Sequence, residues 1–315
     1  MIESGGTLSI TWSDPRSIPR SLLRELVDVP EFAMPDGRWL DLPGRGRTWL
    51  TDLPGPTPDA PAVVLLHAVG CTGLLTWFPV VERLNERYRV VVFDQRWHGR
   101  GIVSEHFSLR DCADDVVAVA DALGLETPVV AGYSMGSIVA QRVWRQHPDR
   151  FGGLVLAATT DHFRTTGSER VFHQSMELGM GALRTLSRSK TISTTSRLTA
   201  DLLLDPTDMH DWALAQFRST SPWAVAQAVA ALGRHHSTPW LPKIDVPTAV
   251  VVTTHDRVLA PHRQRRIAAR IPGATVHEAP CGHAGCVLQA DAFVPAFLEA
   301  VDTTMGRRAS RLPRG

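Results

Sequence analysis

The most constraining feature of the sequence is a regular alternation between short apolar runs and longer stretches with helical periodicity. Each run is four or five residues of mostly Val, Leu and Ala, as expected for a strand buried on both faces of a parallel sheet. Strands that alternate with helices form right-handed βαβ units. The sequence therefore predicts an α/β protein with a mostly parallel central sheet flanked by helices. The strands are expected at 62–66, 89–93, 128–132, 153–157, 248–252 and 275–278, and the helices at 74–87, 109–123, 137–146, 261–271 and 288–301.

Two further strands precede this series, and one long segment interrupts it. Residues 39–42 and 47–53 bracket a turn rich in Pro and Gly, which predicts a strand-turn-strand unit. Residues 160–240 carry helical periodicity without strand-like runs, so we expect a helical cap, or lid, inserted after the sixth strand. The predicted organisation is an N-terminal extension over 1–36 with one short helix, a core of 37–159 and 241–303, the cap over 160–240, and a flexible tail over 304–315.

Composition narrows the possible partners. With 33 Lys and Arg against 32 Asp and Glu, the formal net charge is +1, which gives no reason to expect nucleic acid or an anionic membrane as the main partner. No stretch approaches the roughly 20 apolar residues of a membrane-spanning helix, and the first residues lack the pattern of a secretory signal. We therefore expect a cytoplasmic protein with no stable membrane insertion.

The four cysteines show neither the C-x-x-C spacing of a zinc or redox site nor the density of a disulfide framework. They are Cys71, Cys112, Cys281 and Cys286. We interpret them as buried thiols that pack as small apolar side chains. A less favoured alternative is that Cys281 and Cys286 sense oxidation.

The segment Gly132-Tyr133-Ser134-Met135-Gly136 matches the pattern G-x-S-x-G and joins a predicted buried strand to a predicted helix. A sharp turn at this point lifts the serine hydroxyl above the sheet, and it needs glycine on both sides because the backbone is crowded. The positive end of the following helix favours negative charge on the hydroxyl oxygen. Ser134 is therefore the candidate nucleophile, and the alternative is a glycine turn with an incidental serine.

A serine nucleophile needs a histidine base that is held in one tautomer by a carboxylate. Among 13 histidines, His283 lies on a glycine-flanked loop between the last predicted strand and the last predicted helix. Asp256 lies on the loop after the strand at 248–252, which gives the chain order Ser, Asp, His. His283 is therefore the candidate base and Asp256 the candidate acid. Two alternatives stay open: a role of Asp256 as a helix cap, and Asp161, which follows the strand at 153–157, as the acid.

These motifs resemble those of the α/β-hydrolase family, serine hydrolase branch, over roughly residues 37 to 302. The loop His67-Ala68-Val69-Gly70 is similar to the family's H-G-x-G oxyanion loop, with Ala68 in place of a glycine. An acyl-transfer intermediate needs two N–H donors for its oxyanion. The resemblance implies that the backbone N–H groups of Val69 and Met135 supply them.

The segment that begins at Asp94 resembles another family motif, D-x-R-G-x-G, with Trp97 where its first glycine is expected. In the family this segment is structural, so Asp94, Arg96 and His98 receive no catalytic role.

The resemblance implies an esterase-like or lipase-like enzyme that cleaves a carboxylic ester, or a related acyl bond, of a small or lipid-like molecule. We expect no cofactor. We also expect no metal, because His255, beside Asp256, is not at metal spacing with any partner. Three alternatives use the same fold: a non-catalytic receptor for small molecules, an acyltransferase, and a haloperoxidase-like enzyme with the same triad.

Overall fold

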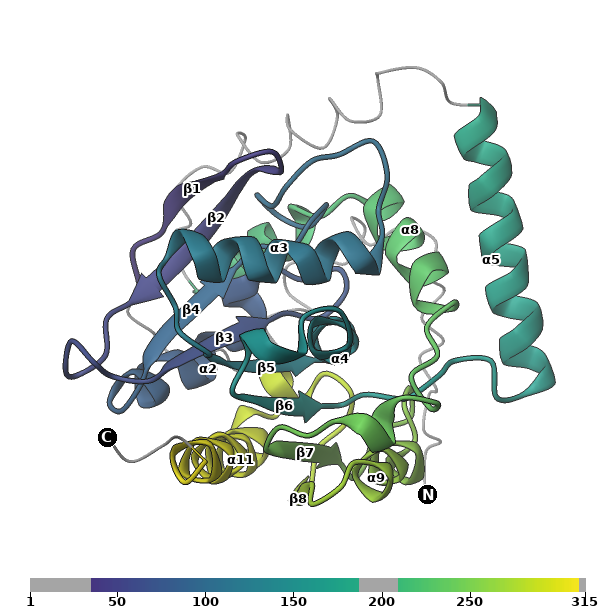
Figure 1. Cartoon of the computed structure of the whole chain (residues 1–315). Coiled ribbons are helices and arrows are strands. Elements are labelled where there is room, and N and C mark those ends of the chain that lie inside the picture. The colour runs from purple at the N-terminus through teal and green to yellow at the C-terminus, as the bar shows by residue number, and fades with distance from the viewer. Residues whose placement is uncertain (1–34, 187–208, 312–315) are drawn as a thin grey trace, which may run out of the picture.

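The computed structural model describes residues 35–186 and 209–311, in which one eight-stranded sheet lies between two layers of helices (Figure 1). The strand order is β1-β2-β4-β3-β5-β6-β7-β8. The β2 strand runs antiparallel to both of its neighbours, and all other pairs are parallel. The predicted mostly parallel sheet is thus confirmed. Its strands are β1 (Arg38–Leu42), β2 (Gly46–Leu53), β3 (Ala62–Leu66), β4 (Arg89–Phe93), β5 (Val129–Tyr133), β6 (Gly153–Ala157), β7 (Thr248–Thr253) and β8 (Thr275–Ala279).

The core consists of two apolar layers, one on each face of the sheet. Val64 and Leu66 pack with α3 (Leu109–Ala122) and α4 (Met135–Gln146), together with α9 (Pro261–Arg270) further along the sheet. Val63 and Leu65 pack on the opposite face with α2 (Gly73–Asn85) and α11 (Ala290–Ala309). Because alternate residues of a strand point to opposite faces, both sets must be apolar, and this explains the unbroken apolar runs of the sequence.

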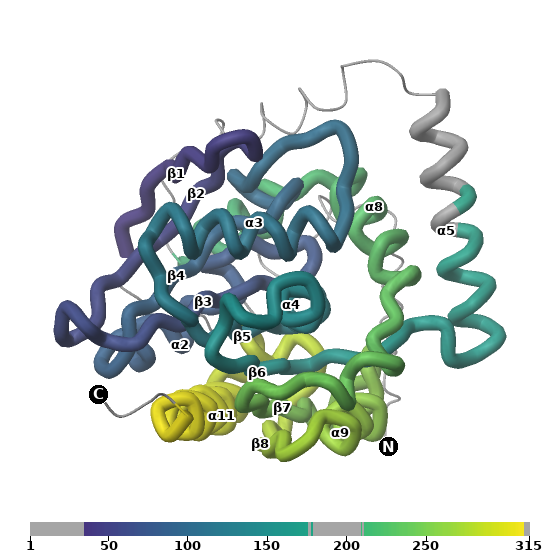
Figure 2. The backbone as a smooth tube through the Cα atoms, viewed as in Figure 1, coloured from purple at the N-terminus to yellow at the C-terminus, as the bar shows by residue number. Residues whose placement is uncertain are grey.

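Among the described residues between β6 and β7, where the helical insertion was predicted, three α-helices are present. They are α5 (Gly167–Leu186), α7 (Met209–Arg218) and α8 (Pro222–Leu232). The backbone tube shows α5 standing away from the sheet, with α8 between it and the core (Figure 2). Trp212 of α7 packs edge to face against Phe78 of α2, with ring centroids 5.6 Å apart. The insertion therefore contacts the core mainly through α7 and α8, whereas its role as a lid stays a prediction.

The end of the chain differs from the prediction. Helix α11 continues to Ala309, past the expected end at residue 301 and into the predicted flexible tail. Thr304 and Met305 are buried, and the guanidinium of Arg308 donates to the carbonyl oxygen of Thr127 at 3.0 Å. The basic residues suggested a frayed end, but one of them docks on the core. The predicted N-terminal extension, with its short helix, lies outside the described residues except for its last two positions.

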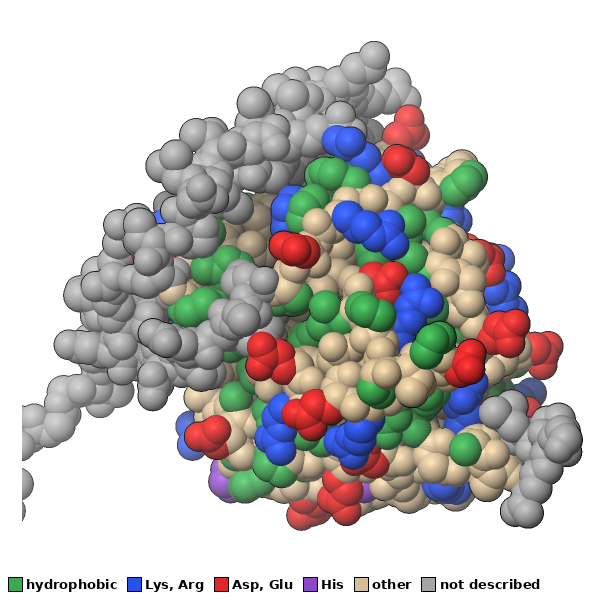
Figure 3. All heavy atoms as spheres, turned by 90° about the vertical axis from the view of Figure 1, so that its left-hand side faces the viewer, with side chains coloured by type: hydrophobic (Ala, Val, Ile, Leu, Met, Phe, Trp, Pro, Cys, Tyr) green, Lys and Arg blue, Asp and Glu red, His purple; other side chains and the backbone are tan. Residues whose placement is uncertain are grey.

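Within the described ranges, no helix is both long enough and apolar enough to cross a membrane. On the face shown in Figure 3, acidic and basic side chains are interspersed among apolar and uncharged ones. The part of this face that is described therefore carries no continuous basic stripe of the kind that follows a phosphate backbone.

Candidate active site

Ser134 lies at a strained turn between β5 and α4. Its backbone has φ 51° and ψ −111°, a conformation that costs a residue other than glycine about 1–3 kcal/mol. A Cβ atom on Gly136 would lie 2.0 Å from the carbonyl oxygen of Leu66, and one on Gly132 would lie 2.3 Å from the carbonyl carbon of Gly136. Gly136 is therefore required by the close approach of α4 to the end of β3, and Gly132 by the close approach of the first turn of α4 to the end of β5.

The three residues predicted as a triad lie in one chain of hydrogen bonds. The Oγ atom of Ser134 is 3.1 Å from Nε2 of His283, and Nδ1 of His283 is 2.7 Å from Oδ2 of Asp256. An ionised carboxylate only accepts, so Nδ1 carries the proton and Nε2 is left to accept the proton of the serine. Both distances are within the reach needed for proton transfer.

Asp256 is buried and has a partner for each carboxylate oxygen. Oδ1 accepts hydrogen bonds from the backbone N–H groups of Val258 and Leu259, each at 2.8 Å. Oδ2 accepts a hydrogen bond from the hydroxyl of Thr253 at 2.9 Å, in addition to the one from His283. Burial by itself raises the pKa of this carboxyl, but the hydrogen bond and charge of His283 and the other donors outweigh it, so the pKa lies below its ordinary value. The carboxylate therefore stays ionised beside the imidazole.

The helix-cap interpretation of Asp256 is wrong. Helix α9 begins at Pro261, its N-cap residue is Ala260, and no side chain caps it. The N–H groups that Asp256 accepts belong to the loop before that helix.

Asp161, the alternative acid, lies at the base of the insertion and is paired with α9 instead of His283. Its carboxylate forms an ion pair with Arg266 and accepts the hydroxyl of Thr238 at 2.7 Å, and Nδ1 of His162 is 3.1 Å away. Although burial raises the pKa, the bonds from Arg266 and Thr238 outweigh it and lower the pKa to about 2. This side chain links the first residues of the insertion to the core.

Sequence reasoning missed three residues that support the triad. Gln264 of α9 is fully buried and donates to the hydroxyl of Thr253 at 2.8 Å and to Oδ2 of Asp256 at 3.2 Å. The hydroxyl of Tyr133 donates to the carbonyl oxygen of His283 at 2.9 Å, which holds the histidine loop. Tyr133 occupies a variable position of its motif, and no motif covers Thr253 or Gln264, so only the tertiary structure identifies them.

The two predicted oxyanion donors follow β3 and β5, which are neighbouring strands of the sheet. Val69 follows β3, Met135 is the first residue of α4, and neither N–H group donates to an acceptor among residues 35–186 and 209–311. The loop that carries Val69 is held at His67, whose Nε2 accepts the N–H of Gln95 at 2.8 Å. Burial lowers the pKa of His67 to about 4, so the ring is neutral, as this acceptor role requires.

The segment after β4 is structural, as expected. Asp94 accepts the N–H groups of Gly73 and Arg100, each at 2.8 Å, and thereby ties this segment to the start of α2. Arg96 forms a bidentate ion pair with the buried carboxylate of Asp115, with both hydrogen bonds at 2.8 Å. Both side chains stabilise loops around the candidate site.

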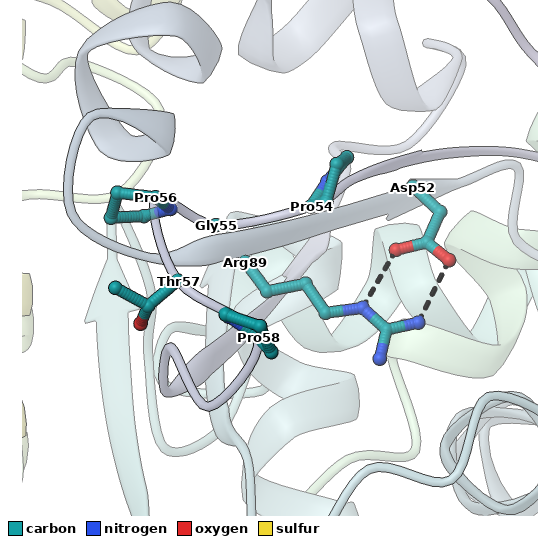
Figure 4. Close-up of a pocket in the computed structure, with 7 residues that line it drawn as sticks. All are labelled: Asp52, Pro54, Gly55, Pro56, Thr57, Pro58 and Arg89. Atoms are coloured by element: carbon teal, nitrogen blue, oxygen red, sulfur yellow. Dashed lines mark hydrogen bonds and ion pairs between the residues drawn. The ribbon is translucent and has the colours of Figure 1, made fainter.

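A recess of about 350 Å³ lies away from this site (Figure 4). The guanidinium of Arg89 crosses it and donates to both carboxylate oxygens of Asp52, at 2.9 and 2.8 Å. Arg89 begins β4, whereas Ser134 follows the end of β5, so the recess lies at the opposite edge of the parallel strands.

All four cysteines are free. Cys112, Cys281 and Cys286 are buried, as predicted, whereas Cys71 is only partly buried. Burial raises the pKa values of Cys71 and Cys281 to about 11, which keeps both as thiols. In the part of the chain that the structure describes, no three His, Cys, Asp or Glu side chains are grouped so that they could hold a metal ion.

Comparisons with known proteins agree with this architecture. The family model for the alpha/beta hydrolase fold matches residues 61–290. The 3-oxoadipate enol-lactonase 1 of Acinetobacter baylyi is 27% identical over 215 residues, which cover 68% of this chain and 78% of that protein. The crystal structure of a hydrolase from Pseudomonas aeruginosa aligns with a TM-score of 0.66 at 24% identity and covers 84% of this chain and 98% of that one. The crystal structure of the enol-lactonase from Burkholderia xenovorans aligns with a TM-score of 0.64 at 24% identity and covers 84% of this chain and 100% of that one. At that identity the two structures show a shared fold alone. With a family model that matches most of its length, this chain belongs to the α/β-hydrolase fold family.

Proposed function

We propose that this protein is a serine hydrolase that cleaves a carboxylic ester, or a related acyl bond, through an acyl-enzyme. The observation that carries the proposal is the hydrogen-bonded series from Ser134 through His283 to Asp256, with distances of 3.1 and 2.7 Å. A nucleophile, a base and an orienting carboxylate in this arrangement are what acyl transfer requires.

The reaction follows from the positions of these groups. Nε2 of His283 takes the proton of Ser134 as its Oγ attacks the carbonyl carbon, and the oxyanion is held by the N–H groups of Val69 and Met135. Asp256 stabilises the imidazolium that forms. His283 then gives its proton to the leaving alcohol, and water resolves the acyl-enzyme by the same route, which releases the acid and restores the serine.

The substrate class is a small-molecule ester. The relative from Acinetobacter baylyi is named as an enol-lactonase, and a lactone is a cyclic ester that the same chemistry opens. We include lactones in the proposal for this reason. The helices between β6 and β7 act as the cap over the bound substrate in this proposal.

The test is active-site labelling combined with turnover of p-nitrophenyl esters of increasing chain length. A fluorophosphonate should label the wild type at Ser134, and Ser134→Ala should lose both the label and about 10⁶-fold of the turnover. The exposed Ser168 provides the matched control, because Ser168→Ala should be labelled like the wild type.

Folded wild-type protein that is neither labelled nor active would contradict the proposal and favour a receptor for small molecules. Labelled protein that transfers the acyl group to an added alcohol faster than to water would identify an acyltransferase instead.

A further inference from the structure

A hydrogen bond joins the described part of the helical insertion to the loop that carries Val69. The hydroxyl of Thr72 donates to Oε1 of Gln216 at 2.8 Å across 144 positions of sequence. Gln216 belongs to α7, and Thr72 ends the loop only three residues after Val69. The insertion therefore touches the loop close to a proposed oxyanion donor.

Both roles of the Thr72 hydroxyl are assigned. Its oxygen accepts the N–H of Leu75 at 3.2 Å, which caps the first turn of α2, and its one proton goes to Gln216. Thr72 is buried, so loss of the Gln216 acceptor leaves this proton without its partner. Gln216 thus decides the orientation of a hydroxyl that also sets where α2 begins.

The centre of the loop is a turn in which the N–H of Cys71 donates to the carbonyl oxygen of Ala68 at 3.3 Å, and the helical insertion packs beside it. The loop is anchored at its start, through His67, and at its end, where the N–H of Gly73 donates to Asp94 at 2.8 Å. Between them, Gly70 has φ 77°, and a Cβ atom placed on it would lie 3.5 Å from a methyl group of Val225 on α8. On the C-terminal side of Val69, α8 therefore lies beside Gly70 and α7 beside Thr72.

We propose that Gln216 is a positioning residue that couples the helical insertion to the oxyanion hole. This inference rests on the proposed function. An oxyanion donor is effective only when it is held about 2.7–3.1 Å from the oxyanion. Because the oxyanion exists in the transition state and not in the bound ester, a displaced loop lowers kcat and leaves KM nearly unchanged.

A second contact of the insertion supplies the matched control. Thr220, between α7 and α8, accepts the N–H of Gly99 at 3.0 Å through its hydroxyl. This bond also ties the insertion to the core, but it ends on the segment after β4, which carries no proposed oxyanion donor. Thr220→Val removes it while keeping the side chain's shape.

The experiment compares Gln216→Leu, Gln216→Ala, Gln216→Glu and Thr220→Val in the full chain. The readouts are kcat and KM for the p-nitrophenyl ester that the wild type turns over fastest, together with Tm. Removal of a whole oxyanion donor costs about 10²–10³ in kcat. We therefore expect a displaced donor to cost about tenfold in Gln216→Leu and Gln216→Ala, with KM within about twofold of the wild type. Gln216→Glu keeps an acceptor oxygen and should restore most of kcat, and Thr220→Val should keep kcat within about twofold.

Unchanged kcat in both Gln216→Leu and Gln216→Ala would overturn the inference, as would an equal loss in Thr220→Val or a change confined to KM. If neither Gln216→Leu nor Gln216→Ala folds, the test rests on Gln216→Glu. A Gln216→Glu variant with a native Tm and a kcat well below the wild-type value would then overturn the inference. The proposed function fails separately, through absence of fluorophosphonate labelling at Ser134 in the wild type.

Discussion

Replacement of Asp256 by Asn should lower turnover, whereas replacement of Asp161 by Asn should lower the free energy of unfolding. Both aspartates are buried at the carboxyl ends of neighbouring strands, and Asn replaces either with little change of shape. In Asp256→Asn, the amide no longer holds the His283 tautomer that accepts the serine proton, so kcat should fall by about 10⁴-fold. In Asp161→Asn, the loss should appear as stability, because its partners are Arg266 and Thr238.

The magnitude for Asp161 follows from its pKa, which is lowered from 3.8 to about 2 in the folded protein. A difference of about 1.8 units corresponds to about 2 kcal/mol of stabilisation. The folded pKa is below the unfolded one, so the contribution is complete above about pH 4 and is lost as the pH falls towards 2. Asp161→Asn should therefore be about 2 kcal/mol less stable at pH 7 and 5, with a difference that shrinks below pH 4.

Urea unfolding of the wild type and Asp161→Asn at pH 7, 5, 4 and 3 measures this difference, and kcat at pH 7 separates the two aspartates. Asp161→Asn should keep kcat within about tenfold per folded molecule. The reasoning is refuted if Asp161→Asn abolishes turnover while Asp256→Asn is nearly silent. A stability difference that stays constant down to pH 3 would refute the charge argument alone.

Two further perturbations test the framework around Ser134. Gly136→Ala places a methyl group against the carbonyl of Leu66 and should lower the free energy of unfolding by at least about 2 kcal/mol and abolish most of the turnover. The control Gly306→Ala, in α11 with nothing within 4 Å of the added methyl, should raise the free energy of unfolding by up to about 1 kcal/mol. Thermal unfolding measures both, and two variants of equal stability would contradict the prediction. Tyr133→Phe removes the bond to the His283 carbonyl and should cost about 1 kcal/mol and reduce kcat by less than tenfold, so unchanged values of Tm and kcat would show that the bond does not hold the loop.

The sheet was largely predictable from the sequence because its strands are buried on both faces. The runs at 62–66, 89–93 and 153–157 match β3, β4 and β6 residue for residue. The C-terminal helix was less predictable. A short helix, α10 (Gly285–Leu288), precedes α11, and the packing of Arg308 on a distant carbonyl leaves no local signal.

The positions of Ser134 and His283 could be predicted because parallel strands end at one edge of the sheet, so loops far apart in sequence meet there. Asp256 was the predicted acid, and Asp161 stayed open as an alternative because both follow strand ends. The structure places Asp256 against His283 and pairs Asp161 with Arg266, a residue of α9 that no motif connects to it. No motif identifies Gln216 either, since its importance arises only from the packing of α7 on the loop before α2.

The first and last residues of the helical insertion lie side by side at the edge of the sheet. The carbonyl of Asp161 accepts the N–H of Ser237 at 2.8 Å, and His162 pairs with His236 in an antiparallel bridge, between strands that are themselves neighbours. Because the two ends of the segment meet, an insertion of another length could join β6 to β7 without altering the register of the sheet. In the proposed enzyme, a graft that keeps Gln216 would change the cap over the substrate and leave Ser134 and His283 in place.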